Sequence, residues 1–173
     1  ALRAARFLAE PPARPFFLSC GFVRTHRLGK GVQWHNGPES PLGDPRYVRP
    51  PAPLPDTPEI RRDIADFAVC AQRLDRCMGV VFDALRRSGR ADDTLVICTT
   101  DHGIAMPRAK CSVYEPGVQV ALLVRLPGRK GWEGGIVHDE MISNIDYLPT
   151  LLDLVGVPIP KKVQGRSFAP LLD

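Results

Sequence analysis

The 173-residue sequence predicts an α/β domain in which helices flank a mainly parallel sheet. Two observations carry this expectation: short apolar runs typical of buried strands, and amphipathic segments typical of helices. A third is their order, which reads strand, long helix, strand, loop, strand, helix over residues 16–154. The sequence contains no internal repeat and no convincing domain boundary. We therefore expect residues 1–173 to belong to one domain.

The expected strands are continuous apolar runs. They are Phe16–Phe22, Thr94–Thr99 and Val118–Leu126, and Pro127 with Gly128 ends the last one. Runs without polar alternation are typical of strands that are buried on both faces, as in parallel sheets.

Three helices are expected, over residues 2–9, from Thr57 to Ser88, and from Asp146 to Leu154. The long helix carries signals at both ends, because Thr57 can cap its first turn and Gly89 can end it. Its apolar residues recur at steps of three and four, which makes one continuous apolar face. They are Ile60, Ile64, Phe67, Ala71, Leu74, Met78, Val81 and Leu85.

A loop rich in Pro and Gly is expected over residues 29–58. Loops of this length inside a compact domain are usually functional or disordered. We interpret this one as a covering loop near the functional site.

Composition excludes several classes of protein. The net charge is +4 and the basic residues are scattered, which argues against a nucleic-acid interface. Five cysteines without a C-x-x-C pair indicate neither a disulfide framework nor a zinc site. No apolar run approaches the roughly 18 residues that a membrane span needs. No signal peptide is evident, and because the chain starts at Ala1 inside an expected helix, the localisation stays undetermined.

Asp101, His102 and Gly103 follow the strand expected at residues 94–99. Ligands of open α/β sheets bind beyond the carboxyl ends of the strands. Asp offers a hard oxygen and His a neutral nitrogen, and both can bind a divalent cation. Taken alone, the pattern fits equally well an Asp that caps a turn beside an exposed His.

The wider sequence resembles the sulfatases, a branch of the alkaline phosphatase superfamily. The segment TLVICTTDHGIAMPRAKCSVYEPGVQVALLVRLPG, residues 94–128, is similar to the family's second signature region. RPFFLSCGFVRTHR, residues 14–27, resembles the strand and loop that carry an active-site His. ISNIDYLPTLLDLVGVPIPKKVQGRSFAPLL, residues 142–172, resembles the family's later Pro-Thr helix and Gln-Gly-Arg-Ser turn. The likeness is nearest to the heparan N-sulfatase-like and bacterial members, and implies an alkaline phosphatase-like fold.

The resemblance implies a role for four residues. Asp101 and His102 match the metal ligands, and the cation is expected to be calcium, with manganese or zinc as alternatives because His102 offers nitrogen. Lys110 matches the basic residue that contacts the sulfate. His26 matches the His that binds the sulfate or protonates the leaving group, so Lys110 and His26 are the expected catalytic and substrate-binding residues. The surrounding Val-Arg-Thr-His-Arg departs from the family's frequent His-x-Pro-His.

The sulfatase nucleophile is a formylglycine made from a Cys or Ser in a Cys/Ser-x-Pro/Ala-x-Arg motif, which these 173 residues do not contain. The paired aspartates that complete the metal site are also absent. The resemblance thus implies the C-terminal portion of a catalytic domain, incomplete at its N-terminus, with the nucleophile in the missing part. A degenerate relative is the alternative. The segment alone is expected to be inactive.

The expected function is the hydrolysis of sulfate esters or sulfamates by a metal-dependent sulfatase, with a sulfated small molecule or glycan as substrate. Two alternatives stay open. One is a phosphodiester or phosphonate monoester hydrolase of the same superfamily, and the other is a catalytically inactive anion-binding module. Neither the substrate nor the oligomeric state follows from the sequence.

Overall fold

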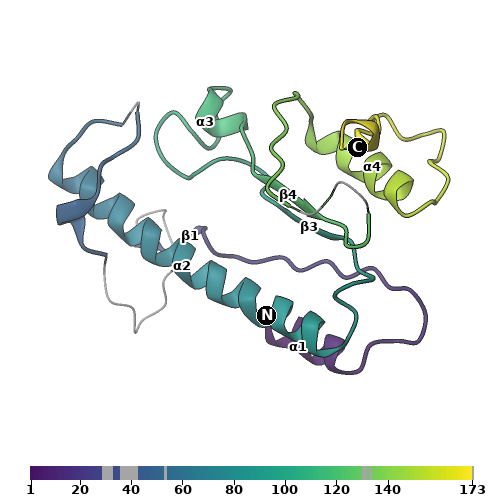
Figure 1. Ribbon diagram of the computed structural model, residues 1–173. Helices are drawn as coiled ribbons and strands as arrows, with labels where there is room; N and C mark the ends of the chain where they lie inside the picture. Colours follow the sequence, from purple (N-terminus) through teal and green to yellow (C-terminus); the bar gives the residue numbers. More distant parts are fainter. Residues whose placement is uncertain (29–32, 36–42, 53, 130–131, 133, 173) are drawn as a thin grey trace. The chain divides into compact units, whose positions relative to one another are not determined.

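A computed structural model describes residues 1–28, 33–35, 43–52, 54–129, 132 and 134–172 (Figure 1). The chain divides into two compact units, Ala1–Ala91 with His102–Gln119, and Asp92–Asp101 with Val120–Asp173. The single domain expected from the sequence stays a prediction, because a compact unit need not be an independent domain.

Two helices form the frame of the first unit. α1 (Leu2–Ala9) packs against α2 (Pro58–Arg87), and both confirm expected helices (Figure 1). The Thr57 hydroxyl accepts a hydrogen bond from the backbone N–H of Ile60 at 3.3 Å, which caps α2 as predicted. Gly89 follows α2 with a φ of +71°, the left-handed conformation that ends many helices.

The core of the first unit lies against the apolar face of α2. β1 (Arg27–Leu28) pairs antiparallel with β2 (Gln33–Trp34). The Trp34 ring packs at 4.9 Å, centroid to centroid, on Phe67 of α2. Buried with Trp34 are Cys70, Met106 and Ala109. The segment after residue 102 therefore packs into the same core as α2 and β2.

The loop expected over residues 29–58 is described only in part, because residues 29–32, 36–42 and 53 lie outside the described chain. The described part contains β2 and a short 3-10 helix, η1 (Pro45–Tyr47). Asp44 caps η1 and also forms an ion pair with Arg46. The role of this loop as a cover for the site stays a prediction.

The second unit combines a strand pair with a short helix. β3 (Val96–Thr99) pairs with β4 (Leu122–Arg125), and α4 (Tyr147–Leu154) follows the 3-10 helix η2 (Asn144–Asp146). A last 3-10 helix, η3 (Ala169–Leu171), lies near the end of the chain. β3, β4 and α4 confirm elements expected from the sequence, although both strands are shorter than the apolar runs that predicted them.

Asp146 organises the start of α4 and the C-terminal segment together. One carboxylate oxygen accepts the backbone N–H of Ser143 at 3.0 Å, and the other accepts that of Arg166 at 2.8 Å. The buried Thr150 hydroxyl accepts the backbone N–H of Phe168 at 2.9 Å. The Gln-Gly-Arg-Ser turn is thus fastened through its backbone to the first turns of α4.

One expected strand is wrong. Residues 16–22 form no strand, although the whole run is described, and the Phe17 side chain is 77% exposed. Phe16 instead makes an edge-to-face contact with Phe7 of α1, with the ring centroids 5.2 Å apart. A strand exists only where a partner supplies ladder hydrogen bonds, and the local sequence does not reveal that partner.

Helices and strands alternate as the expected α/β fold requires, and the direction of the local strand pairs is a detail that the sequence did not predict. Both strand pairs within the described residues are antiparallel. Between β3 and β4 the chain makes an excursion whose ends meet, because the Gly103 N–H donates to the Gly117 carbonyl at 3.1 Å. A chain that returns beside its point of departure enters the next strand in the opposite direction, as in a hairpin.

Candidate active site

Two glycines close the loop that carries Lys110. A Cβ added at Gly103 would lie 1.7 Å from the carbonyl oxygen of Pro116, and one added at Gly117 would lie 2.3 Å from that of Ala109. Neither approach is open to any other residue without a backbone shift. These are the glycines of the Asp-His-Gly and Glu-Pro-Gly motifs, so the two motifs are the two ends of one loop.

The backbone around Lys110 is held tightly. Its N–H donates to the carbonyl of Ile104 at 3.0 Å, and the preceding Ala109 is only 2% exposed. Arg108 and Cys111 have φ values of 61° and 65°, a left-handed conformation that costs a non-glycine residue about 1–2 kcal/mol. Such strain persists only where the surrounding structure imposes it, and it is concentrated at functional sites.

The structure brings Lys110 together with His26. The Lys110 Nζ lies 3.3 Å from the His26 Nε2, although the two residues are 84 positions apart. An ammonium group only donates hydrogen bonds, so Nε2 is the acceptor and the ring proton lies on Nδ1. Nδ1 then donates to the Arg27 carbonyl at 2.5 Å. The His26 ring is thus held from one nitrogen by Lys110 and from the other by the backbone of Arg27.

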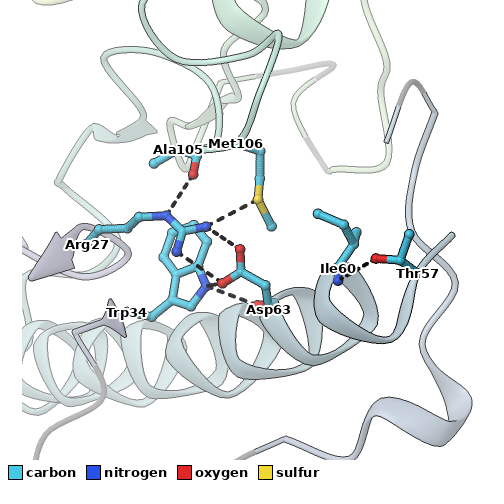
Figure 2. A network of polar contacts seen from close by, with 7 residues as sticks. All are labelled: Arg27, Trp34, Thr57, Ile60, Asp63, Ala105 and Met106. Carbon is cyan, nitrogen blue, oxygen red and sulfur yellow. Dashed lines mark hydrogen bonds and ion pairs between the residues drawn. The ribbon is translucent and has the colours of Figure 1, made fainter. Parts of the chain in front are cut away.

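A polar network that the sequence did not predict is centred on Arg27, the residue after His26 (Figure 2). Arg27 donates from Nε to the Ala105 carbonyl at 2.8 Å, and from its two terminal nitrogens to the Asp63 carboxylate at 3.0 and 2.5 Å. Its guanidinium carbon also lies 3.9 Å from the Trp34 ring centroid. The Trp34 Nε1 donates to Asp63 as well, at 2.8 Å.

One sequence signal could have revealed this network. Asp63 lies three residues after Ile60 and four before Phe67, on the apolar face of the long helix. A carboxylate in such a position needs a partner. Its partner, Arg27, directly follows the expected site residue His26.

A hollow of about 410 Å³ adjoins Lys110. It lies within the first unit, and its wall combines the network with the loop. The lining residues are Arg27, Asp63, Ala105, Met106, Pro107, Lys110 and Cys111. The hollow is shallow and open, and because Arg27 and Asp63 are paired with each other, its net positive charge comes from Lys110.

The ring of His102 is oriented by a hydrogen bond to the backbone. Its Nδ1 lies 2.8 Å from the Gly103 carbonyl, to which it donates, and this places the ring's lone pair on Nε2. Metal-binding histidines usually donate their second nitrogen to a carbonyl or carboxylate in this way. Asp101, which follows β3 by two residues, is exposed.

The donor set of a complete cation site is not assembled from the described residues, among which no three His, Cys, Asp or Glu side chains group together. Calcium takes six to eight oxygen ligands, so Asp101 and His102 could supply only part of its shell. Asp101 belongs to the second unit, and His102, Lys110 and His26 belong to the first. The convergence of all four on one cleft therefore stays a prediction.

None of the five cysteines forms a disulfide. Burial raises the pKa of the Cys70 and Cys98 thiols, which disfavours the reactive thiolate. Cys20 and Cys77 are half-buried, and Cys111 is exposed. Cys70 and Cys98 therefore serve the packing of the chain rather than nucleophilic chemistry.

Within the residues described, no helix is long and apolar enough to cross a membrane.

Comparison with known proteins identifies the family. The Sulfatase family model matches residues 1–157. N-sulphoglucosamine sulphohydrolase from Homo sapiens is 34% identical over an alignment 200 residues long, which covers 99% of this chain and 39% of that protein. Endo-4-O-sulfatase from Bacteroides thetaiotaomicron is 38% identical over 171 residues, which cover 91% of this chain and 32% of that protein.

A solved structure extends the comparison to the fold. A phosphonate monoester hydrolase from Silicibacter pomeroyi superposes with a TM-score of 0.69 and 27% identity, over 99% of this chain and 40% of the other. The α/β fold is thus the alkaline phosphatase-like one that the sequence implied. The chain spans about two fifths of the length of this protein and of the human relative. On the match of its sequence and of its fold, this chain belongs to the sulfatase family.

Proposed function

We propose that this chain supplies part of the active site of a sulfatase, which hydrolyses sulfate esters or sulfamates with the help of a divalent cation. One observation carries the proposal: the Lys110 Nζ lies 3.3 Å from the His26 Nε2. Both residues stand where the sulfatase pattern has its sulfate-binding groups, and the fold brings them together from distant segments. Membership of the sulfatase family supports the same reaction.

The pair is suited to a tetrahedral anion. Hydrolysis places negative charge on the sulfate oxygens and on the leaving oxygen, and fixed donors stabilise that charge better than water does. Lys110 has three N–H donors, of which one reaches His26, so the other two are directed elsewhere and can serve sulfate oxygens. A fixed ammonium thus provides charge without reorganisation.

His26 has a second role in this proposal, which depends on its proton. With its proton on Nδ1, the ring accepts from Lys110 and cannot donate from Nε2. Once protonated, it can no longer accept, so it separates from Lys110 and donates from Nε2. In that state the Nε2 proton is available to the leaving oxygen, while the Lys110 ammonium keeps its N–H donors for the sulfate oxygens.

Asp101 and His102 would hold the cation, calcium or alternatively manganese or zinc, and its positive charge would stabilise the charge that develops on the sulfate. The hydrogen bond from the His102 Nδ1 to Gly103 supports this assignment, because it orients the ring for Nε2 ligation. The remaining ligands and the formylglycine nucleophile would come from sequence outside these 173 residues.

The substrate class that we propose is a sulfated sugar. The names of N-sulphoglucosamine sulphohydrolase and endo-4-O-sulfatase support it. The hollow beside Lys110 supports it further, since polar and apolar groups line it together.

A second candidate is the hydrolysis of phosphonate monoesters, which the similarity to the Silicibacter pomeroyi enzyme favours. A phosphonate monoester is also a tetrahedral anion, so Lys110 and His26 would serve it equally well. A catalytically inactive anion-binding module is the third.

The test uses the full-length protein that contains this chain, with an aryl sulfate and an aryl phosphonate monoester as substrates. Lys110→Ala should lower kcat/KM by roughly 100-fold or more, as expected for the loss of one charge-stabilising donor. Lys161→Ala removes an exposed lysine of the second unit and should leave kcat/KM unchanged. After chelation, Asp101→Ala should need more added cation than wild type to regain activity.

Each outcome selects one candidate. Turnover of the sulfate that Lys110→Ala abolishes supports a sulfatase, and faster turnover of the phosphonate supports the second candidate. Lys110-dependent sulfate binding without turnover of either substrate supports the inactive module. Unchanged kinetics in Lys110→Ala would refute the site itself.

A further inference from the structure

We propose that Arg27, held by Asp63, is a positioning residue that sets the distance between His26 and Lys110. This inference rests on the proposed function, because it concerns the same pair of side chains. Arg27 itself is not expected to contact the reacting atoms.

Arg27 forms hydrogen bonds to His26 and to the loop that carries Lys110. Its backbone carbonyl accepts the Nδ1 proton of His26 at 2.5 Å, which fixes the plane and the tautomer of that ring. Its Nε donates to the Ala105 carbonyl at 2.8 Å, in the loop that carries Lys110. One residue therefore links the segment of His26 to the loop of Lys110 (Figure 2).

Asp63 fixes the guanidinium itself. Both carboxylate oxygens accept from Arg27, and the side chains of Arg27 and Asp63 are only 15% and 28% exposed. Charge-assisted pairs with two parallel bonds fix orientation as well as distance, and shielding from water strengthens them. Asp63 lies on α2, a helix of 30 residues, so it gives the network a rigid base.

Trp34, which lies on β2, limits the movement of the Arg27–Asp63 ion pair. The Arg27 guanidinium lies 3.9 Å from the Trp34 ring centroid, and the Trp34 Nε1 donates to Asp63 at 2.8 Å. The guanidinium thus binds a carbonyl and a carboxylate while it stacks on a ring. A lysine could not satisfy these partners together, because its ammonium is a compact point charge.

If the Arg27–Asp63 ion pair had a purely structural role, it would contribute to stability without affecting the geometry of His26 and Lys110. The two roles therefore differ in one measurable quantity: whether the effect of Arg27 on turnover depends on Lys110. A double-mutant cycle measures that dependence directly.

The experiment uses the full-length protein and the sulfate ester substrate. Arg27→Lys keeps the positive charge but loses the planar guanidinium that donates to two acceptors at once. This substitution should lower kcat/KM by about 10- to 100-fold, the range expected when a catalytic group is displaced by up to 1 Å. Asp63→Asn keeps the size of the side chain but turns an N–H toward the guanidinium, and should have a similar effect.

Arg61 offers a matched control, and it lies on α2, the helix that carries Asp63. It forms a two-point ion pair with Asp56 at 2.5 and 2.7 Å, and it donates to the Val48 carbonyl at 2.8 Å. Arg61→Lys makes the same chemical change without contact to the loop of Lys110. Its kcat/KM should stay within about twofold of wild type.

The cycle then combines Arg27→Lys with Lys110→Ala. If Arg27 acts by positioning Lys110, its substitution should lower the residual kcat/KM of Lys110→Ala by less than about threefold. A full 10- to 100-fold loss in that background would overturn the inference. So would an Arg27→Lys enzyme as active as Arg61→Lys, provided that Lys110→Ala is impaired.

The outcomes separate this inference from the proposed function. Unchanged activity in Lys110→Ala refutes the proposed site, whatever Arg27→Lys does. If Arg27→Lys lowers the melting temperature much more than Arg61→Lys does, the cycle is repeated with Asp63→Asn. An independent, additive effect of Asp63→Asn would then overturn the positioning role.

Discussion

The close approach at Gly103 gives a substitution whose effect can be worked from the structure. The Cβ of Gly103→Ala would lie 1.7 Å from the Pro116 carbonyl oxygen, and real contacts of this kind stay beyond 3.0 Å. The two backbone segments must therefore separate by about 1.3 Å, the difference between those distances. The atom in the way is backbone, so no side-chain rotation relieves the contact.

The free-energy cost of Gly103→Ala has two parts. Separation breaks the hydrogen bond from the Gly103 N–H to the Gly117 carbonyl, which contributes about 1 kcal/mol net. Forced displacement in a packed region adds about 1–3 kcal/mol. The free energy that opens the loop should therefore fall by about 2–4 kcal/mol. Because a shift of about 1 Å at a catalytic group costs about 100-fold in rate, kcat/KM should fall by a similar factor.

Two measurements on the full-length protein check this prediction. Amide hydrogen exchange over residues 103–118 reports the local opening free energy, and steady-state kinetics report kcat/KM. Gly79→Ala is the matched control, because nothing lies within 4 Å of its added Cβ and α2 gains a better helix former. Native exchange and native kinetics in Gly103→Ala would show that the close approach does not hold the loop.

Two further predictions concern the first unit. Thr57→Ala removes the cap of α2 and should destabilise it by about 1 kcal/mol, seen as faster amide exchange in its first turn, whereas Thr57→Ser should not. The hydrogen bonds from the Arg46 side chain lower the pKa of Asp44 to about 2. The stability that this pair adds should be complete above the ordinary carboxyl pKa of about 4 and lost as the pH falls through about 2. Carboxyl NMR titration should show that value, and Arg46→Gln should return it toward 4.

Local signals predicted the helices well. Thr57 lies one residue before α2 and Gly89 two residues after it. Ile64 and Phe67 of the apolar stripe pack against the core, although Leu85 is the one member of the stripe among the four fully buried residues of α2. These features act between neighbours along the chain, so they can be read from the sequence alone. The run over residues 16–22 failed for the opposite reason: its apolar residues suit a strand, but a strand needs a partner that no local pattern specifies.

The site likewise contains residues that local sequence motifs predicted and a pair that they did not. Lys110 and His26 were proposed from their motifs, and the structure places them together, while their roles stay predictions. The pair of Arg27 and Asp63 was missed because 36 positions separate its members, and because Asp63 lies in none of the segments that carry the resemblance. An isolated carboxylate on an apolar helix face reveals that a partner is needed, but only the fold reveals which one.

The attachment of the C-terminal segment makes it an intramolecular ligand of α4. Backbone N–H groups of Arg166 and Phe168 are bound by side chains of the helix region, Asp146 and Thr150, rather than by the segment that leads to them. The exposed Lys162 precedes this docked stretch. A tryptic cut there would break the backbone without breaking those bonds, so the residues that follow the cut would stay attached to α4. The unbroken backbone keeps the C-terminal segment at a high local concentration near α4, whereas the contacts themselves do not depend on it.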